Sequence, residues 1–158
     1  MLKMRELRKG DDLKDLVSLS RLFFIEYEKF HKDYFKLDKL KDKDLKSMFV
    51  ESLKDKNSKT IVAIDNEKTV GYIIFSIRER PPFYKIKKRG HVSALLIHKD
   101  YRRKGIAARL LDEAKKWFKS KGVKYFDLET SINNLGAVKF YSKSNLKQLR
   151  HQFIGEAK

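Results

Sequence analysis

The chain has 158 residues, a formal net charge of +17 and no cysteine. The lack of cysteine excludes disulfide bonds, thiolate metal sites and a cysteine nucleophile, and 41% hydrophobic residues at regular spacing argue against a disordered chain. We expect residues 1–158 to form a single domain, and because no apolar run has the length of a membrane span or a signal-peptide core, we expect a cytoplasmic protein with no membrane partner.

The first third of the chain predicts an edge strand followed by two helices. Residues 2–7 alternate apolar and charged side chains, which is typical of a half-buried strand. The acidic pair after Gly10 forms a turn and a helix cap. Apolar residues from Leu13 to Tyr27 then recur at helical spacing. A second, lysine-rich helix follows, with its inward side chains between Leu45 and Leu53 and its charges on a solvated face.

The middle of the chain predicts three strands. Thr60–Ile64 and Val70–Ile77 are rich in β-branched residues, and the polar residues between them form a hairpin connection. Residues 78–90 contain two prolines and several basic side chains, which favours an irregular loop. His91–Ile97 is an almost unbroken apolar run, short enough to be a buried strand.

The last third adds a long helix, a strand and a short helix. Ala107–Phe118 is amphipathic at helical spacing, and Gly122 is a typical C-terminal cap for this helix. Val123–Thr130 predicts the next strand and Leu135–Lys143 a short helix, and Leu146–Ile154 can supply one or two final strands. This order predicts an α/β fold with helices on both faces of a sheet.

The positive charge is spread along the chain. A charge of this size attracts anions, which include nucleic acids, acidic proteins and anionic cofactors. The sequence has neither an arginine-rich tail nor a recognisable platform of aromatic and basic residues that would stack bases. We therefore interpret the lysines as solvated helix faces and do not expect nucleic acid as a partner.

A phosphate-binding pattern joins the apolar strand to the long helix. The first turn of a helix has unpaired backbone N–H groups and the positive end of the helix dipole, so it attracts phosphate. Gly105 and Ala107 would let an anion approach this backbone closely. Arg102, Arg103 and Lys104 add positive charge at the same point.

Two stretches resemble the GNAT family of N-acetyltransferases. Arg102-x-x-Gly105-x-Ala107, directly after a strand ending Leu95-Leu96-Ile97, resembles the family's acetyl-CoA pyrophosphate loop. Asn134-x-x-Ala137-x-x-Phe140-Tyr141 resembles the second half of its cofactor site. The resemblance covers essentially the whole chain and implies a single-domain α/β fold. Its central sheet would be mixed and mostly antiparallel, with helices on both faces and two splayed parallel strands, Val92–Ile97 and Tyr125–Thr130.

The same resemblance implies acetyl-CoA as cosubstrate and assigns residues to it. The strand backbone would hydrogen-bond the pantetheine amides, and the helix-start amides would bind the pyrophosphate. Asn134 would either bond cofactor amides or cap the following helix. The implied binding residues are Leu95, Leu96, Ile97, Arg102, Arg103, Lys104, Gly105, Ile106, Ala107, Ala108, Asn134 and Tyr141.

The chemistry implied is direct transfer of an acetyl group to a primary amine of a small molecule, peptide or protein. By resemblance, Tyr141 would protonate the departing thiolate as a general acid. Glu129 is our first candidate for the base, because strand alternation would place it beside Asp127. His91 is the second, since an imidazole can accept a proton near neutral pH. No histidine spacing indicates a metal site.

An alternative function stays open at this point. The same fold could serve as a non-catalytic acyl-CoA-binding or nucleic-acid-associated module. The identity of the acceptor amine and the presence of a homodimer are also left open by the sequence.

Overall fold

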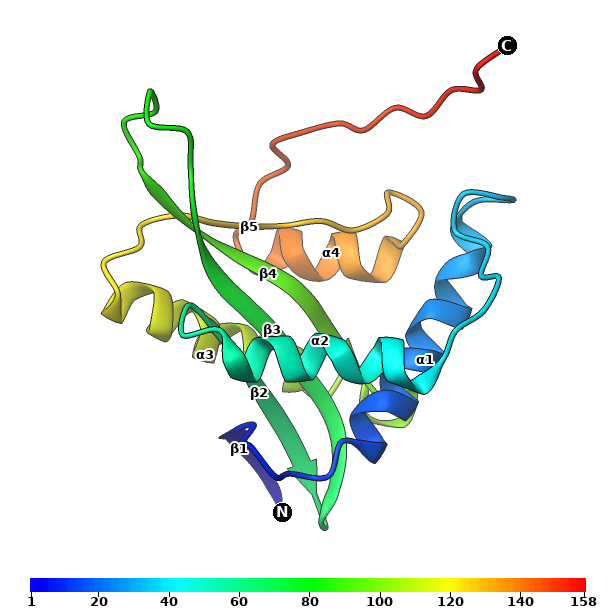
Figure 1. Ribbon diagram of the computed structural model, residues 1–158, viewed down its shortest axis with the longest axis vertical. Coiled ribbons are helices and arrows are strands. Elements are labelled where there is room, and N and C mark those ends of the chain that lie inside the picture. The colour runs from blue at the N-terminus through cyan, green and yellow to red at the C-terminus, as the bar shows by residue number, and fades with distance from the viewer.

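The computed structural model describes all residues from 1 to 158 (Figure 1). It has five strands, four α-helices and two short 3-10 turns. In chain order these are β1 (Leu2–Glu6), α1 (Lys14–Tyr27), η1 (Glu28–Phe30), α2 (Asp42–Lys54), β2 (Ser58–Asp65), β3 (Lys68–Glu79), β4 (Lys88–Ile97), η2 (Lys99–Tyr101), α3 (Ile106–Ser120), β5 (Phe126–Leu128) and α4 (Leu135–Lys143).

One sheet organises the molecule, with its strands in the order β1-β2-β3-β4-β5. The first three pairings are antiparallel, and β4 pairs with β5 in parallel. Asn66 and Glu67 connect β2 to β3 with φ angles of 48° and 68°, the left-handed backbone that a tight hairpin requires. The predicted mixed, mostly antiparallel sheet is confirmed.

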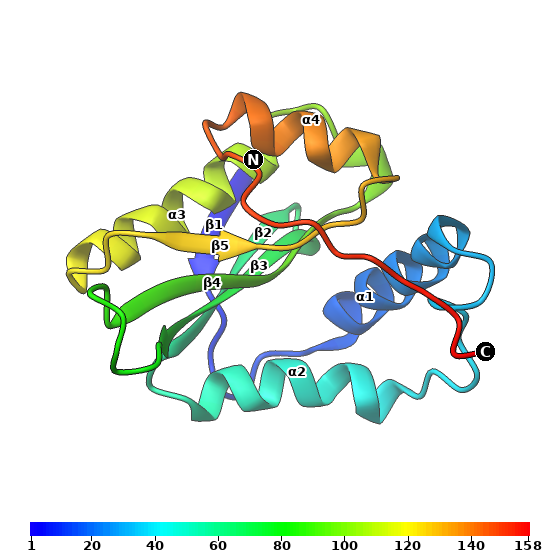
Figure 2. The same cartoon turned by 90° about the horizontal axis from the view of Figure 1, so that it is seen from above.

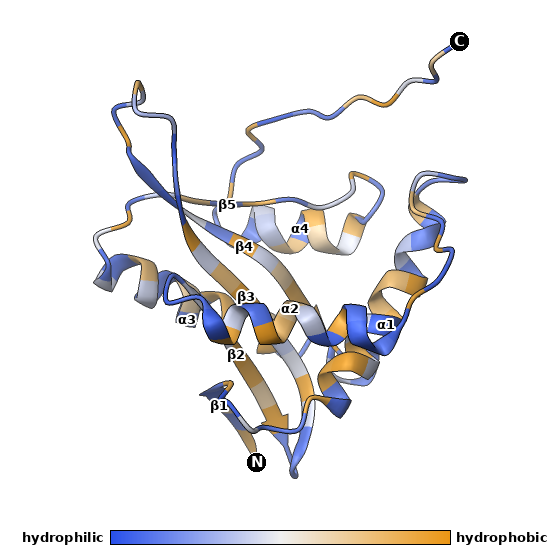
Figure 3. Ribbon diagram, viewed as in Figure 1, coloured by the Kyte–Doolittle hydropathy of each residue, from blue (hydrophilic) through white to orange (hydrophobic).

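Helices cover both faces of the sheet, as predicted. Figure 2 shows α1 and α2 on one side, and α3 and α4 on the other. On the α3 side, fully buried Phe75 packs edge to face against Trp117 and Phe118, with ring centroids 5.4 and 5.5 Å apart. On the α1 side, Tyr72 packs against Phe49 with centroids 5.0 Å apart. Figure 3 shows the matching hydropathy, with apolar strands between helices that are polar on their outer faces.

The hairpin between β3 and β4 is longer than the sequence predicts. The ladder continues to Glu79↔Lys88, so the expected irregular loop over 78–90 reduces to residues 80–87. The prediction was wrong because the prolines lie only at the tip, where no ladder hydrogen bonds are needed.

The end of the chain also departs from the prediction. β5 covers Phe126–Leu128 and not Val123–Thr130, and residues 146–158 form no strand. Leu146 still packs against the core, but Leu149 and Phe153 are 86% and 90% exposed, so neither a sheet edge nor the core holds the chain around them. None of the helices is both long and apolar enough to cross a membrane.

Candidate active site

The sheet opens between β4 and β5. The two strands pair only from Gly90↔Phe126 to Val92↔Leu128, and β4 then continues to Ile97 without a strand partner on that edge. A bulge at Ser93, which has no partner on β3, lies where the two strands part. The predicted pair of splayed parallel strands is therefore present, although β5 is short.

The edge of β4 that faces the gap has no strand partner, and of its outward backbone groups only Ile97 O has a partner, the Arg102 Nε. His98 N–H donates to Val70 O on β3 at 2.8 Å. Because N–H and C=O groups alternate sides along a strand, those of Leu95 and Ile97 face away from β3. They point into the gap between β4 and β5, where an extended ligand could pair with them as an added strand.

The start of α3 borders the same gap and is not capped. Gly105 is the N-cap residue with φ 76°, and no side chain accepts a hydrogen bond there. Arg103 also has a positive φ, 62°. The backbone N–H groups from Arg103 to Ala108 donate no hydrogen bond within the protein, and the first N–H to do so is that of Arg109, to Gly105 O at 3.1 Å. Six free amides at the positive end of a helix dipole form a ready anion site.

The side chain of Arg102 connects the loop before α3 to two neighbouring elements. Its Nε donates to Ile97 O at 3.0 Å, and its guanidinium pairs with Glu26 on α1 at 3.0 Å. Lys104 lies over the Tyr101 ring at 5.1 Å. The guanidinium of Arg102 thus fixes the loop against β4 and α1.

The C-terminal end of α1 spans the gap. The Glu26–Arg102 ion pair ties it to the loop after β4. On the other side, Ser131 N–H donates to the Tyr27 hydroxyl at 2.6 Å, and the Asn133 amide donates to Phe30 O at 3.1 Å. These contacts hold the connection after β5 away from β4, and so they keep the strands apart.

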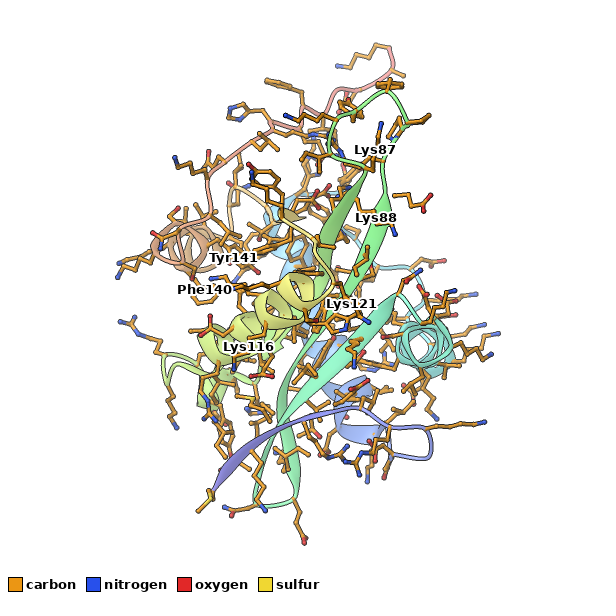
Figure 4. All side chains as sticks on the ribbon, turned by 90° about the vertical axis from the view of Figure 1, so that its left-hand side faces the viewer. Lys87, Lys88, Lys116, Lys121, Phe140 and Tyr141 are labelled. Carbon is orange, nitrogen blue, oxygen red and sulfur yellow. The ribbon has the colours of Figure 1, made fainter.

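Two predicted residues lie at the start and in the last turn of α4. Asn134 is its N-cap, and its Oδ1 accepts from Ala137 N–H at 3.3 Å. Burial, with the nearby Tyr27 hydroxyl, raises the pKa of Tyr141 to about 12. The hydroxyl is therefore protonated at neutral pH, as that of an unperturbed tyrosine also is. Figure 4 marks Tyr141 beside Phe140 on α4, and Phe140 packs against the core on the α3 side of the sheet.

A second group of polar side chains lies where β4 and β5 still pair. His91 Nδ1 and Asp127 Oδ1 are 2.6 Å apart, and Arg89 binds the other Asp127 oxygen. Burial opposes ionisation of Asp127, but hydrogen bonds from His91 and Arg89 outweigh it, so the pKa of Asp127 lies below its usual value. Glu129 comes just after the end of β5, exposed, with no hydrogen bond or ion pair to its carboxylate.

The sequence missed this three-residue cluster. Alternation placed Asp127 and His91 on candidate strands, but only the parallel register His91↔Asp127 brings them together. The register is a long-range property, so the only signal available was the opposite charge of Arg89 and Asp127.

A mixed sheet that opens between two parallel strands, in front of an uncapped helix start, defines this chain as a single-domain α/β protein of the acetyltransferase type. Residues 16–145 match the sequence model of the acetyltransferase (GNAT) family, and the chain belongs to that family. It is 30% identical over 148 residues to an N-alpha-acetyltransferase of Saccharolobus solfataricus, with 89% of this chain and 77% of that protein covered. The family expected from the sequence is confirmed.

Solved structures agree on the fold. The chain resembles a mutant of the BH1408 protein from Bacillus halodurans with a TM-score of 0.85 at 19% identity, over 98% of this chain and 99% of that one. It also resembles the aminoglycoside N-acetyltransferase AAC(6')-Iy in complex with CoA, with a TM-score of 0.79 at 14% identity, over 100% of this chain and 95% of that one. At such identities the likeness concerns the fold alone.

Proposed function

We propose that this protein transfers the acetyl group of acetyl-CoA directly to a primary amine. The observation that carries the proposal is the row of six unpaired amides from Arg103 to Ala108 beside the unpaired edge of β4. The amides would hold the diphosphate, and the backbone of Leu95 and Ile97 would pair with the amides of the pantetheine arm. The capping contact of Asn134 leaves its side-chain N–H groups for the same arm.

Tyr141 is the proposed general acid. As the amine nitrogen bonds to the thioester carbon, the carbon–sulfur bond breaks and the tyrosine hydroxyl gives its proton to the departing thiolate. The Tyr141 hydroxyl is protonated throughout the neutral range, as a proton donor must be, but its raised pKa makes it a weaker acid. The proposed role therefore rests on the match of Asn134-x-x-Ala137-x-x-Phe140-Tyr141 to the family's motif and not on this pKa. The amine loses its own proton to a base or to water.

Glu129 remains the first candidate for that base. Its carboxylate is exposed and unpaired, so it is available to accept a proton. His91 is the competing candidate, because Asp127 occupies its Nδ1 and leaves Nε2 as the nitrogen that could accept. Glu129→Gln and His91→Gln separate the two, since loss of the true base removes the acidic limb of the pH dependence of kcat/KM.

A peptide α-amine is the acceptor we favour. The 30% identical relative is named an N-alpha-acetyltransferase. An α-amine has a pKa near about 8, against about 10.4 for a lysine side chain, so a larger share of it is neutral at physiological pH. The base therefore has to deprotonate a smaller share of an α-amine than of a lysine side chain.

The test is release of free thiol from acetyl-CoA with four acceptor classes, namely a peptide with a free N-terminus, a free amino acid, a polyamine and an aminoglycoside. We expect turnover with the peptide and loss of turnover when its N-terminus is blocked. Tight CoA binding without acetylation of any acceptor would instead support the non-catalytic module.

A further inference from the structure

The β3–β4 hairpin projects from the body of the protein as an arm, which we define as residues 78–89. Its two strands pair at Arg78↔Arg89 and Glu79↔Lys88. The tip is ordered, because Arg80 N–H donates to Lys87 O at 2.8 Å and Tyr84 N–H donates to Pro81 O at 3.1 Å. Figure 1 shows the arm extending past the sheet, at the end of β4 opposite to the gap.

The arm is strongly basic. It carries six basic residues and one acidic residue, and among the basic ones only Arg89 has a carboxylate partner. Gly90 N–H donates to Tyr125 O at 2.8 Å, which places the α3–β5 connection with its Lys121 and Lys124 beside the base of the arm. Figure 4 shows Lys87 and Lys88 on the same side of the molecule as Lys121. The unpaired cations thus form a strip from the tip of the arm to the end of α3.

Exposed aromatic rings accompany the cations. Phe83 is 80% exposed and Tyr84 is 42% exposed, with ring centroids 4.8 Å apart. The Arg80 guanidinium lies 4.0 Å from the Tyr84 ring, and Lys124 lies 5.2 Å from the ring of Tyr125, which is 56% exposed. None of these rings belongs to the core. Exposed rings with cations beside Tyr84 and Tyr125 are what stacked bases and their phosphates require.

We propose that the arm, with Lys121, Lys124 and Tyr125, binds single-stranded nucleic acid. A purely acidic segment such as polyglutamate would use the cations but has no group that stacks on the Phe83 ring, whereas a base does. A membrane would contact the tip but not the strip that runs on to the end of α3. The sequence did not predict this partner because its basic and aromatic residues look dispersed until the hairpin brings them together.

The test is fluorescence anisotropy of a labelled oligouridine strand across a salt series. Replacement of both arm lysines, Lys87→Ala with Lys88→Ala, should lower the slope of log affinity against log salt by about 1.4, since each phosphate contact with a single strand contributes about 0.7. Phe83→Ala should weaken binding by about tenfold with an unchanged slope, because stacking involves no counterion release.

The matched control is Lys43→Ala with Lys46→Ala, which removes the same charge from exposed positions on α2. It should change neither quantity beyond the small effect of net charge. An effect as large as that of the arm pair would overturn the proposal. So would the absence of binding at about 0.15 M salt, or stronger binding to phosphatidylserine vesicles or polyglutamate than to oligouridine. Circular dichroism melting of each variant confirms that the fold is intact.

Discussion

The two ends of β4 differ in how their backbone and side-chain groups are satisfied. At the N-terminal end, the strand pairs with both β3 and β5. A Cβ on Gly90 would lie 2.6 Å from the Phe118 ring, so the packing there has no room to spare. At the C-terminal end, the edge facing the gap has no strand partner, and the amides that follow it at the start of α3 are free.

We infer from this difference that the N-terminal end of β4 contributes mainly to stability and its C-terminal end mainly to activity. Most of the free amides at the start of α3 belong to exposed residues, so water can satisfy them and a bound anion can replace that water without breaking a contact within the protein. Substitutions at the closed end should therefore reduce stability, and substitutions around the open end should reduce activity without unfolding the protein.

Tyr141→Phe should have the largest effect on activity. Loss of a general acid lowers kcat by roughly 10²- to 10⁴-fold, while the phenyl ring keeps the packing of α4. Steady-state thiol release and thermal melting measure the two quantities. The role of acid is refuted if kcat falls by less than a few fold. As a matched control, Tyr34→Phe removes a hydroxyl from an exposed tyrosine and should leave kcat unchanged.

Gly90→Ala tests the closed end. The added methyl group meets the Phe118 ring, which is 2% exposed and cannot move freely. Overpacking of this kind costs about 1–3 kcal/mol of the free energy of unfolding. For a domain of this size the melting temperature should fall by roughly 5 °C. Gly136→Ala on α4, where a Cβ meets nothing within 4 Å, should instead preserve or raise stability. Equal melting of the two variants would contradict the tight packing.

Ala108→Glu tests the open end, because it should raise the stability of the protein and weaken its binding of acetyl-CoA. A carboxylate in the first turn of α3 favours the helix dipole, so stability should rise by a few tenths of a kcal/mol, about 0.3 or more. The same charge repels a diphosphate bound to the neighbouring amides, which should raise KM for acetyl-CoA by about tenfold. Ala108→Gln has the same shape without the charge. If both variants raise KM equally, the effect is steric and not electrostatic.

The local elements of this site could be predicted from the sequence. The glycine at 105, the amphipathic helix after it and the bounds of Leu135–Lys143 follow from short-range patterns, and the structure has them where expected. Capping of α4 is one of the two roles that the sequence predicts for Asn134, and the structure shows it.

The length of β5 could not be predicted, because it depends on distant contacts. The apolar pattern of 123–130 suits a longer strand, but Tyr27 at the end of α1 and Phe30 in η1 bind the connection at Ser131 and Asn133. Those contacts, more than 100 residues apart in the chain, end the pairing with β4. The gap is thus created by tertiary contacts, and the spacing of apolar residues in the sequence does not predict it.

The smallest effect should come from Asp127→Asn, at the closed end. The pKa of Asp127 is depressed in the folded protein, below the value of about 3.9 for an unfolded chain. The ionised carboxylate therefore contributes stability above about pH 4, and this contribution is lost as the pH falls through the folded pKa. Because the side chain is 41% exposed, the contribution is less than about 1 kcal/mol.

Urea unfolding of the wild type and of Asp127→Asn between about pH 3 and pH 7 measures this contribution. We expect the two stability curves to differ at neutral pH and to converge in acid. Asp38→Asn, at an exposed carboxylate without an ion-pair partner, should follow the wild type throughout. The same variants sharpen the comparison of the two ends of β4. If Asp127→Asn also shifts the acidic limb of kcat/KM, His91 is the base that Asp127 positions, and the closed end takes part in catalysis. If only the stability curve changes, the contacts of Asp127 with His91 and Arg89 serve stability alone, and Glu129 remains the proposed base.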